Sequence, residues 1–270
     1  WNNKAVERNL KSLEKMNVKV FSPKKGLLAC GSKGAGKLME VDDIIDNLNH
    51  IFYPKALSDL KVIVTAGPSI EPIDPFRFLS NYSSGIQGYE IAKSLYYHGA
   101  KTTLITGITN LQKPKNINVI KVSSASDFYN KVANNLPCDV LVSPAAISDW
   151  KVKRISSQKI KKNKNDTLNI SFLKNIDVLE NISKHPKKPK LIIGFSAETS
   201  NLITNSKSKL KKKGCDWMIA NNVGENKVFG STHNKVSFIA DKKIEHWPKM
   251  KKSDVAKKIS KKIVNFFKKK

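Results

Sequence analysis

The chain has few arginines, although it is strongly basic. Arg8, Arg77 and Arg154 are its only arginines, so 46 of the 49 basic residues are lysine. The net charge of +27 by itself favours a nucleic-acid partner. Surfaces that bind nucleic acids, however, usually use arginine for bidentate contacts. Because lysine is spread over the whole chain together with much asparagine, we interpret the charge as a compositional bias and expect no nucleic-acid partner.

Cysteines are also few, and long apolar runs are missing. Cys30, Cys138 and Cys215 are widely spaced and odd in number, which argues against a disulfide framework and for a reducing compartment. No CxxC motif or histidine cluster indicates zinc. No apolar run reaches the roughly 18–20 residues of a membrane span, and no secretory signal is present. We therefore expect a cytoplasmic protein without a membrane partner, and because it begins at Trp1 we expect ends that differ from a natural translation product.

The sequence shows no nucleophile–base arrangement. Its five histidines lie in predicted helices or polar loops without an ordered partner motif, so a protease or esterase triad is excluded. A strict dinucleotide fingerprint is missing as well, since Gly85 and Gly88 have the wrong spacing and Lys101 stands near the place of the required acid. A Rossmann-type dehydrogenase and a basic nucleic-acid-binding module remain as alternatives to the interpretation developed below.

The segment 61–95 predicts a buried strand, a long polar loop and a helix that opens on glycine. Val62, Ile63 and Val64 form a short β-branched run, and an apolar stripe with helical spacing follows Gly85 and Gly88. Small residues at a helix start leave backbone N–H groups open, which favours an anion site. The same glycines are also compatible with a plain structural turn.

Strands and helices alternate from residue 61 onward. The predicted strands are 61–65, 101–106, 117–122, 139–143, 190–195, 216–220 and 235–240. The predicted helices are 86–98, 125–135, 175–184, 200–213 and 253–268. This alternation predicts an α/β fold with three αβα layers and a mostly parallel sheet, Rossmann-like or ribokinase-like. Ligands of such sheets bind beyond the carboxyl ends of the strands, so we expect 67–88, 143–162 and 195–199 to converge on one cleft.

Two segments differ from this pattern. Residues 1–58 contain predicted helices at 5–16 and 42–51, an edge strand at 18–21 and a glycine-rich loop at 27–37, which is too little to bury a core. Residues 151–172 predict a basic flap leading into a strand with alternating Leu168, Ile170 and Phe172.

The candidate functional residues of this chain are those suited to bind a phosphate or the Mg²⁺ that accompanies it. Asp149, at a predicted strand end, is a candidate Mg²⁺ ligand, although a turn cap is an equally simple role. Lys159, Lys209 and Lys213 are candidates for contacting phosphate, although any of them can be a solvated lysine in a chain this rich in lysine.

Residues 61–241 resemble the phosphopantothenate–cysteine ligase family, whose motifs occur here in the family's order. The matching residues are Thr65-Ala66-Gly67-Pro68, Asp74-Pro75, Arg77, Ser80-Asn81-Tyr82-Ser83-Ser84-Gly85, Gly88, Ala145-Ala146, Asp149, Lys159-Ile160-Lys161-Lys162, Lys174-Asn175, Asp177, Gly194-Phe195, Ala197-Glu198-Thr199, Ala220-Asn221 and Phe229-Gly230-Ser231. Asn222 departs from the pattern, because an acid often follows the Ala-Asn pair.

The first 58 residues resemble the C-terminal end of a flavin-dependent phosphopantothenoylcysteine decarboxylase, which precedes the ligase in many bacteria. Cys30, with Gly31, Gly34 and Gly36, resembles its substrate-flap loop, although Ser32 and Lys37 depart from the pattern. The resemblance implies a decarboxylase remnant with linker at 1–58 and a ligase domain at 59–270. FMN is implied only for the decarboxylase half that is missing here, so we expect no independent decarboxylase activity.

The ligase resemblance implies that CTP activates the carboxylate of 4'-phosphopantothenate as an acyl-cytidylate, with Mg²⁺, and that cysteine then displaces CMP. By this resemblance Asn81 holds the intermediate, Lys159 stabilises phosphoryl charge, Asp149 binds Mg²⁺ and nucleotide, and Arg77 meets the substrate phosphate across a dimer interface. Ala146 is implied as a further substrate contact. The implied nucleotide site also contains Ser143, Pro144, Ala145, Ile176, Asp177, Val178, Leu179, Phe195, Lys209 and Lys213. The implied partners are these small molecules and a second copy of the chain, in a homodimer or higher oligomer.

Overall fold

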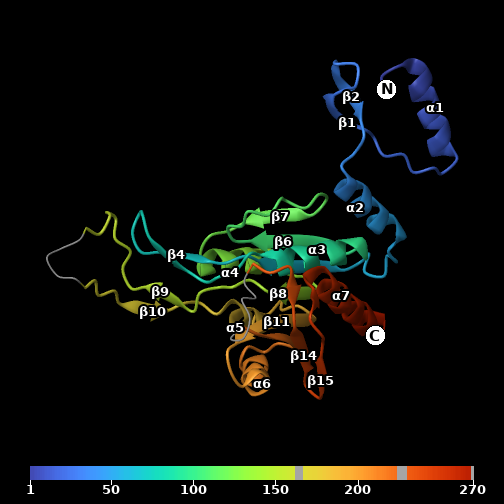
Figure 1. Cartoon of the computed structure of the whole chain (residues 1–270). Coiled ribbons are helices and arrows are strands. Elements are labelled where there is room, and N and C mark those ends of the chain that lie inside the picture. The colour runs from blue at the N-terminus through green and yellow to red at the C-terminus, as the bar shows by residue number, and fades with distance from the viewer. Residues whose placement is uncertain (162–166, 224–229, 269–270) are drawn as a thin grey trace. The chain divides into compact units, whose positions relative to one another are not determined.

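The computed structural model describes residues 1–161, 167–223 and 230–268 (Figure 1). The internal contacts divide the chain into two compact units, Trp1–Tyr53 and Pro54–Lys270. In the described parts of both units, no helix is both long and apolar enough to cross a membrane.

The first unit has two helices and one hairpin. Helix α1 (Lys4–Lys15) begins at Asn3, whose side chain accepts a hydrogen bond from the backbone N–H of Ala5 at 2.8 Å. Strands β1 (Lys24–Leu27) and β2 (Lys33–Lys37) pair antiparallel, and helix α2 (Val41–Phe52) follows. Neither helix contains a buried residue, which agrees with the expectation that this segment buries no core of its own.

Two predictions for this unit need correction. The glycine-rich loop predicted over 27–37 is largely the β1–β2 hairpin, and Cys30 lies in its turn. The edge strand predicted at 18–21 is wrong, because these residues form no strand. Val18 and Phe21 remain exposed, so their alternation has no partner surface on which to bury an apolar face.

An eight-stranded sheet forms the centre of the second unit. In spatial order its strands are β15 (Lys243–His246), β14 (Val236–Ala240), β12 (Trp217–Asn222), β11 (Leu191–Glu198), β8 (Val140–Ser143), β3 (Lys61–Ala66), β6 (Lys101–Thr106) and β7 (Asn118–Lys121). The six strands from β12 to β7 run parallel, and β14 and β15 continue the sheet antiparallel at one edge. The mostly parallel sheet that the sequence predicts is therefore confirmed.

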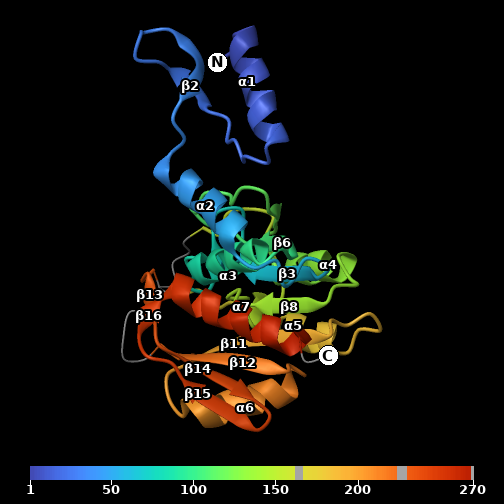
Figure 2. The same ribbon diagram turned by 90° about the vertical axis from the view of Figure 1, so that its right-hand side faces the viewer.

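Helices cover both faces of this sheet. On one face lie α3 (Ile86–Tyr97) and α7 (Lys252–Lys268), and on the other lie α4 (Ala125–Asn134), α5 (Val178–Ser183) and α6 (Leu202–Lys212) (Figure 2). Successive side chains of β3 serve the two faces in turn: Val62 and Val64 pack in the cluster with α3 and α7, whereas Ile63 packs in the cluster with α4, α5 and α6. The predicted three-layer αβα arrangement is thus confirmed.

The predicted elements of the second unit are all present, with small differences at their ends. Helix α5, predicted over 175–184, begins only at Val178, because the Asp177 side chain accepts a hydrogen bond from the N–H of Glu180 at 3.1 Å and caps the helix. Strand β11 extends to Glu198, three residues beyond its predicted end at 195.

Short strand pairs lie outside the large sheet. These are β4 (Ile70–Pro72) with β5 (Phe78–Ser80), β9 (Trp150–Val152) with β10 (Phe172–Lys174), and β13 (His233–Asn234) with β16 (Met250–Lys251). Figure 1 shows β4, β9 and β10 beyond one side of the sheet. We call residues 70–80, 150–161 and 167–174 the arm. The strand predicted from the alternation of Leu168, Ile170 and Phe172 is shorter than expected, because only its last residue lies in β10.

The long polar loop predicted after β3 is also wrong, because most of it is the β4–β5 hairpin. The Asp74 carboxylate accepts hydrogen bonds from the N–H groups of Phe76 (2.7 Å) and Arg77 (2.8 Å), which closes the turn. Glu71 is buried and accepts a hydrogen bond from the N–H of Ala125 at 2.9 Å, at the start of α4. Polar residues of the predicted loop therefore fix its backbone, and strands of three residues carry too little periodicity to be recognised.

Candidate active site

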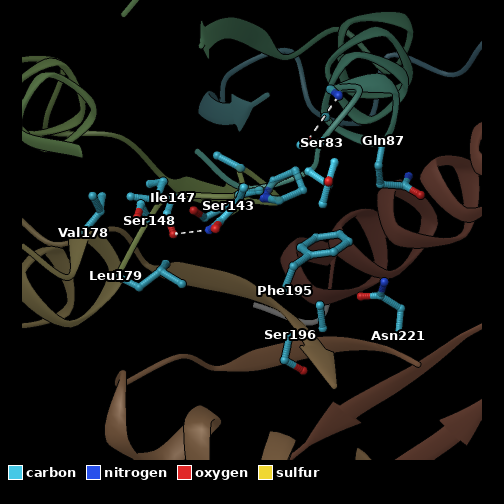
Figure 3. Close-up of a pocket in the computed structure, with 18 of the residues that line it drawn as sticks. Ser83, Gln87, Ser143, Ile147, Ser148, Val178, Leu179, Phe195, Ser196 and Asn221 are labelled. Atoms are coloured by element: carbon cyan, nitrogen blue, oxygen red, sulfur yellow. Dashed lines mark hydrogen bonds between the residues drawn. The ribbon is translucent and has the colours of Figure 1, made fainter. Parts of the chain in front are cut away.

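A cavity of about 560 Å³ opens beyond the carboxyl ends of the parallel strands. Four stretches line it, namely 80–88, 143–149, 176–179 and 195–197, together with Lys209, Lys213, Asn221, Gly230, Asn234 and Lys252. Figure 3 shows side chains from these stretches around the pocket. The predicted convergence of 67–88, 143–162 and 195–199 is thus confirmed for the part of each stretch that lines the cavity.

The start of α3 forms one wall of the pocket. Gly85 precedes the helix with φ 78°, and no side chain caps the first turn. Gly88 lies against β3: a Cβ on it would come within 2.6 Å of the Ala66 Cβ and 2.7 Å of the Thr65 carbonyl oxygen. The helix therefore begins close to the sheet with backbone N–H groups available, and such a terminus stabilises anions.

The loop after β8 forms a second wall and is tied to the end of β3. The Ala145 N–H donates to the Thr65 hydroxyl at 3.3 Å, and the Ala146 N–H donates to the Gly67 carbonyl at 2.9 Å. The Asn81 side-chain amide donates from Nδ2 to the Ile147 carbonyl at 3.2 Å. These bonds hold the loop before any ligand is bound, so the polar groups of this wall are preorganised.

Two lysines of the pocket already have anionic partners. Lys209 Nζ lies 2.7 Å from Glu198, and Lys213 Nζ lies 3.3 Å from Asp177. Both lysines are partly exposed, so each pair contributes little to stability. The lysines are therefore held at the pocket wall in a defined position, with their charge balanced in the absence of a ligand.

Arg77 and Lys159 lie together on the arm and do not line the pocket. Arg77 forms an ion pair with Asp74 at 3.3 Å and donates to the Ile160 carbonyl at 3.0 Å. Lys159 Nζ lies 4.1 Å from the centre of the Phe76 ring, as in a cation–π contact. The arm thus holds Arg77 and Lys159 together as one assembly, separate from the pocket.

Asp74 organises this assembly. Burial by itself would raise the pKa of its carboxyl group. Hydrogen bonds from the backbone N–H groups of Ile160, Phe76 and Arg77, together with the Arg77 charge, lower this pKa instead. Asp74 therefore joins the β4–β5 turn to the segment that carries Lys159, and these bonds favour its ionised form.

The structure brings most of the predicted site residues together. Lining the pocket are Asn81, Ser143, Pro144, Ala145, Ala146, Asp149, Ile176, Asp177, Val178, Leu179, Phe195, Lys209 and Lys213. Cys30 belongs to the first unit, where hydrogen bonding to Ser32 lowers the pKa of its thiol. Lys162 and Phe229, which belong to two of the matched motifs, lie outside the described residues.

Sequence reasoning missed several residues of the pocket. Gln87, Asn234 and Lys252 line it, but none was a candidate. Gln87 lies between Gly85 and Gly88, the glycines that predict the start of the helix. Its position in the first helical turn could have identified it as a residue of the anion site. Lys252 is one lysine among 46, and the sequence offers nothing that separates it from the others.

The pocket fits a magnesium ion that arrives with phosphate, but no all-protein cage for a metal exists within the described residues. Asp149 supplies one exposed carboxylate at the pocket. Mg²⁺ typically binds through one or two carboxylates plus substrate phosphates and retains several waters. The donor set is thus adequate for Mg²⁺ only together with a phosphate ligand.

Comparison with known proteins gives a consistent result. The family model described as "DNA/pantothenate metabolism flavoprotein C-terminal domain" matches residues 57–267. The chain is 41% identical over 266 residues to the "Coenzyme A biosynthesis bifunctional protein CoaBC" of Borreliella burgdorferi, covering 97% of this chain and 67% of the relative. It is 33% identical to the protein of that name from Vibrio vulnificus, covering 94% of this chain and 62% of the relative. The chain therefore spans about two thirds of the length of these relatives.

A solved structure supports the same relationship. The crystal structure of the C-terminal domain of a CoaBC protein is 29% identical to this chain with a TM-score of 0.68, and the match covers 80% of this chain and 100% of that domain. A "DNA/Pantothenate Metabolism Flavoprotein" from Streptococcus pneumoniae, 19% identical with a TM-score of 0.66, shares the fold.

Proposed function

The chain belongs to the family of the DNA/pantothenate metabolism flavoprotein C-terminal domain, and from this membership we propose that it ligates cysteine to 4'-phosphopantothenate with consumption of CTP. The relatives' names place them in coenzyme A biosynthesis. The observation that carries the proposal is the pocket itself, where an uncapped helix start, a preorganised loop and held lysines surround one cavity. Such a site suits a reaction that depends on charge neutralisation and positioning.

The proposed reaction has two steps. A carboxylate oxygen of phosphopantothenate attacks the α-phosphorus of CTP, the bond to the bridging oxygen breaks, and pyrophosphate leaves with that electron pair. The cysteine amine then attacks the acyl carbon, the acyl–oxygen bond breaks, and CMP leaves while the amine loses a proton. The N–H groups at the start of α3 stabilise phosphate charge, and Asn81 orients the acyl-cytidylate. Mg²⁺ bound with Asp149 supplies charge neutralisation at the phosphates.

The direct test follows product formation. The full chain is incubated with CTP, Mg²⁺, phosphopantothenate and cysteine, and phosphopantothenoylcysteine and pyrophosphate are measured by mass spectrometry and a coupled assay. Pyrophosphate release should require phosphopantothenate, and the amide product should require cysteine as well. This function would be refuted if pyrophosphate were released at the same rate without phosphopantothenate, or if well-folded protein gave no amide product. Exchange of CTP for ATP in the same assay measures nucleotide preference.

The two units have separate roles in this proposal. Every matched ligase motif lies after residue 60, and the first unit resembles a decarboxylase remnant with its Cys30 flap and a linker over 1–58. In this proposal FMN is assigned to a decarboxylase half and not to the pocket of the ligase unit.

We expect a chain that begins at Pro54 to have the same ligase activity per mole of protein as the full chain. It keeps Leu57, which is 1% exposed and whose N–H donates to the His98 carbonyl at 2.9 Å. A chain that begins at Lys61 is the control, because it loses this anchor and should unfold at a lower temperature. Loss of most activity in a folded chain starting at Pro54 would contradict the separation of roles.

We expect the protein to form a dimer through the arm. Three aromatic side chains of the arm are more than half exposed, namely Phe76, Phe78 and Trp150. An exposed apolar group of this kind marks an interaction surface. Burial against a second copy would also bring Arg77 and Lys159 of the arm to the partner's substrates.

Sedimentation at micromolar concentration should therefore give twice the chain mass of 30.2 kDa. The change Phe78→Ser should raise the dimer dissociation constant by about 30-fold or more, because truncating a central aromatic typically costs at least 2 kcal/mol. Phe52→Ser, at an exposed aromatic of the first unit, is the control. A monomer of the unaltered chain at these concentrations would overturn this expectation.

A further inference from the structure

Lys252 is a buried lysine of the pocket, and it has no anionic partner among the described residues. Its side chain is 7% exposed, and it lines the cavity. The other two lysines of the wall are paired with Glu198 and Asp177, whereas no ion pair or hydrogen bond holds the Lys252 ammonium within the described residues. Burial lowers the pKa of this ammonium. Because the stem of Lys252 is buried and its ammonium at the pocket has no counter-charge among the described residues, this position favours an anionic ligand.

The position of Lys252 places it beside the start of α3. It is the first residue of α7, and its own N–H donates to the Thr232 carbonyl at 2.9 Å. Gln87, in the first turn of α3, donates from Nε2 to the Lys252 carbonyl at 3.1 Å. The two helices therefore begin at the same part of the pocket, and the partial positive charge of both N-termini adds to the ammonium charge. In Figure 3, Gln87 extends from α3, and Phe195 and Asn221 border this part of the cavity.

The pocket has a chemical polarity. Figure 3 shows Ile147, Val178 and Leu179 on the side opposite to Gln87 and Asn221. The side with Ile147, Val178 and Leu179 thus offers apolar surface beside the paired Asp177 and Lys213, whereas the other side carries Lys252, which has no anionic partner among the described residues, and two helix starts. A nucleoside triphosphate has the same polarity, since its base is planar and weakly polar and its terminal phosphates carry most of the charge.

Two further polar atoms near this end have no partner. Gln87 Oε1 and Asn234 Oδ1 are buried acceptors without a donor among the described residues. A phosphate oxygen cannot satisfy an acceptor, but ordered water can, because it also donates hydrogen bonds. This end of the pocket therefore offers a cation for the phosphate oxygens and acceptors for the water that accompanies them.

We infer that Lys252 binds the β- and γ-phosphates of the nucleotide and holds the pyrophosphate as it leaves. This inference rests on the proposed function, which supplies a nucleoside triphosphate as substrate. When the carboxylate oxygen attacks the α-phosphorus, the electron pair of the breaking bond passes to the bridging oxygen, so negative charge grows on pyrophosphate. The ammonium stabilises this charge at the end of the pocket away from Ile147 and Leu179.

The test measures binding by calorimetry with the full chain and four probes, Mg²⁺-pyrophosphate, Mg²⁺-CTP, CMP and phosphopantothenate. We expect Lys252→Met to weaken pyrophosphate and CTP by about 10- to 100-fold, the range for loss of a charge-assisted hydrogen bond. CMP lacks the terminal phosphates, so its affinity should stay unchanged. Lys252→Arg keeps the charge and should recover most of the lost affinity. Lys251→Met is the matched control, because Lys251 precedes it in the chain and is exposed outside the pocket.

Each other outcome has a defined meaning. Unchanged pyrophosphate binding by Lys252→Met, or equal loss for CMP and pyrophosphate, overturns the inference. Loss of phosphopantothenate binding in place of pyrophosphate binding overturns it as well, since Lys252 would then serve the other substrate. A thermal melt checks that Lys252→Met is folded, and Lys252→Arg tests the charge if it is not. The proposed function fails separately, if the unaltered chain binds pyrophosphate but makes no phosphopantothenoylcysteine.

Discussion

Asn81→Asp is expected to slow formation of the cysteine product by about 10²–10³-fold while acyl-cytidylate accumulates. The side-chain amide donates to the Ile147 carbonyl at 3.2 Å, which holds it at the pocket wall. An aspartate in its place removes the donor and adds a negative charge beside an anionic intermediate. The second step suffers most, because the intermediate has to be held until cysteine attacks.

Two other variants separate the steps further. Lys159→Gln should also stall the second step, if dimerisation through the arm brings this lysine to the intermediate. It should leave the fold intact, because Lys159 is exposed and lies over the exposed Phe76 ring. Asp149→Asn should instead weaken binding of Mg²⁺-CTP and reduce pyrophosphate release itself.

Rapid quenching with labelled CTP, followed by separation of CTP, acyl-cytidylate and CMP, distinguishes these results. Asn118→Asp is the control for the charge change, because Asn118 lies on β7 and outside the pocket. Turnover at the unaltered rate in both Asn81→Asp and Lys159→Gln would refute the assignment of these two residues.

Gly88→Ala is expected to lower the free energy of unfolding by about 1–3 kcal/mol, the range for overpacking, and Tm by roughly 2–12 °C for a unit of this size. Alanine gains about 1 kcal/mol in helix propensity, so the sign depends on the space available. The new Cβ would lie 2.6 Å from the Ala66 Cβ and 2.7 Å from the Thr65 carbonyl oxygen. These atoms are a Cβ and a backbone oxygen of the central strand β3 and not the end of a flexible side chain, so the clash outweighs the gain.

The same change should weaken nucleotide binding, since α3 has to move away from the sheet and its N–H groups move with it. Thermal unfolding and calorimetry with CTP measure the two effects. Lys93→Ala, on the same helix but partly exposed, should change the stability by less than about 0.5 kcal/mol. A Gly88→Ala protein as stable as the unaltered chain would show that α3 is not fixed by this contact.

The sheet was predictable because each buried strand is a short run of apolar residues and each helix that follows has apolar residues at helical spacing. Val62, Ile63 and Val64 are apolar in succession since both faces of β3 are covered, and continuous apolar runs followed by helical spacing mark such strands. The pocket was predictable for a related reason, because parallel strands end at one edge and carry their loops there.

What the sequence did not reveal depends on single contacts. The β4–β5 hairpin is closed by hydrogen bonds to Asp74. A single carboxylate in a polar segment gives no pattern from which this role could be predicted. Lys252 differs from Lys251 only in being buried, a property that arises when α7 packs beside α3. In a chain where one side chain type is abundant, the residue that binds a ligand has no compositional signature.

The carboxylates that hold Lys209 and Lys213 have a consequence for how a nucleotide enters. The two lysines are already paired before any phosphate binds, because Glu198 and Asp177 are their counterions. A polyanion that recruits these lysines has to displace an anion already present, so binding is an exchange of partners at nearly constant local charge. Dissolved salt weakens the old pair as well as the new one, and the two effects offset each other. The proposed nucleotide site can thus remain selective for anions of the right shape in a protein of net charge +27, because other anions in solution do not find its lysines unpaired.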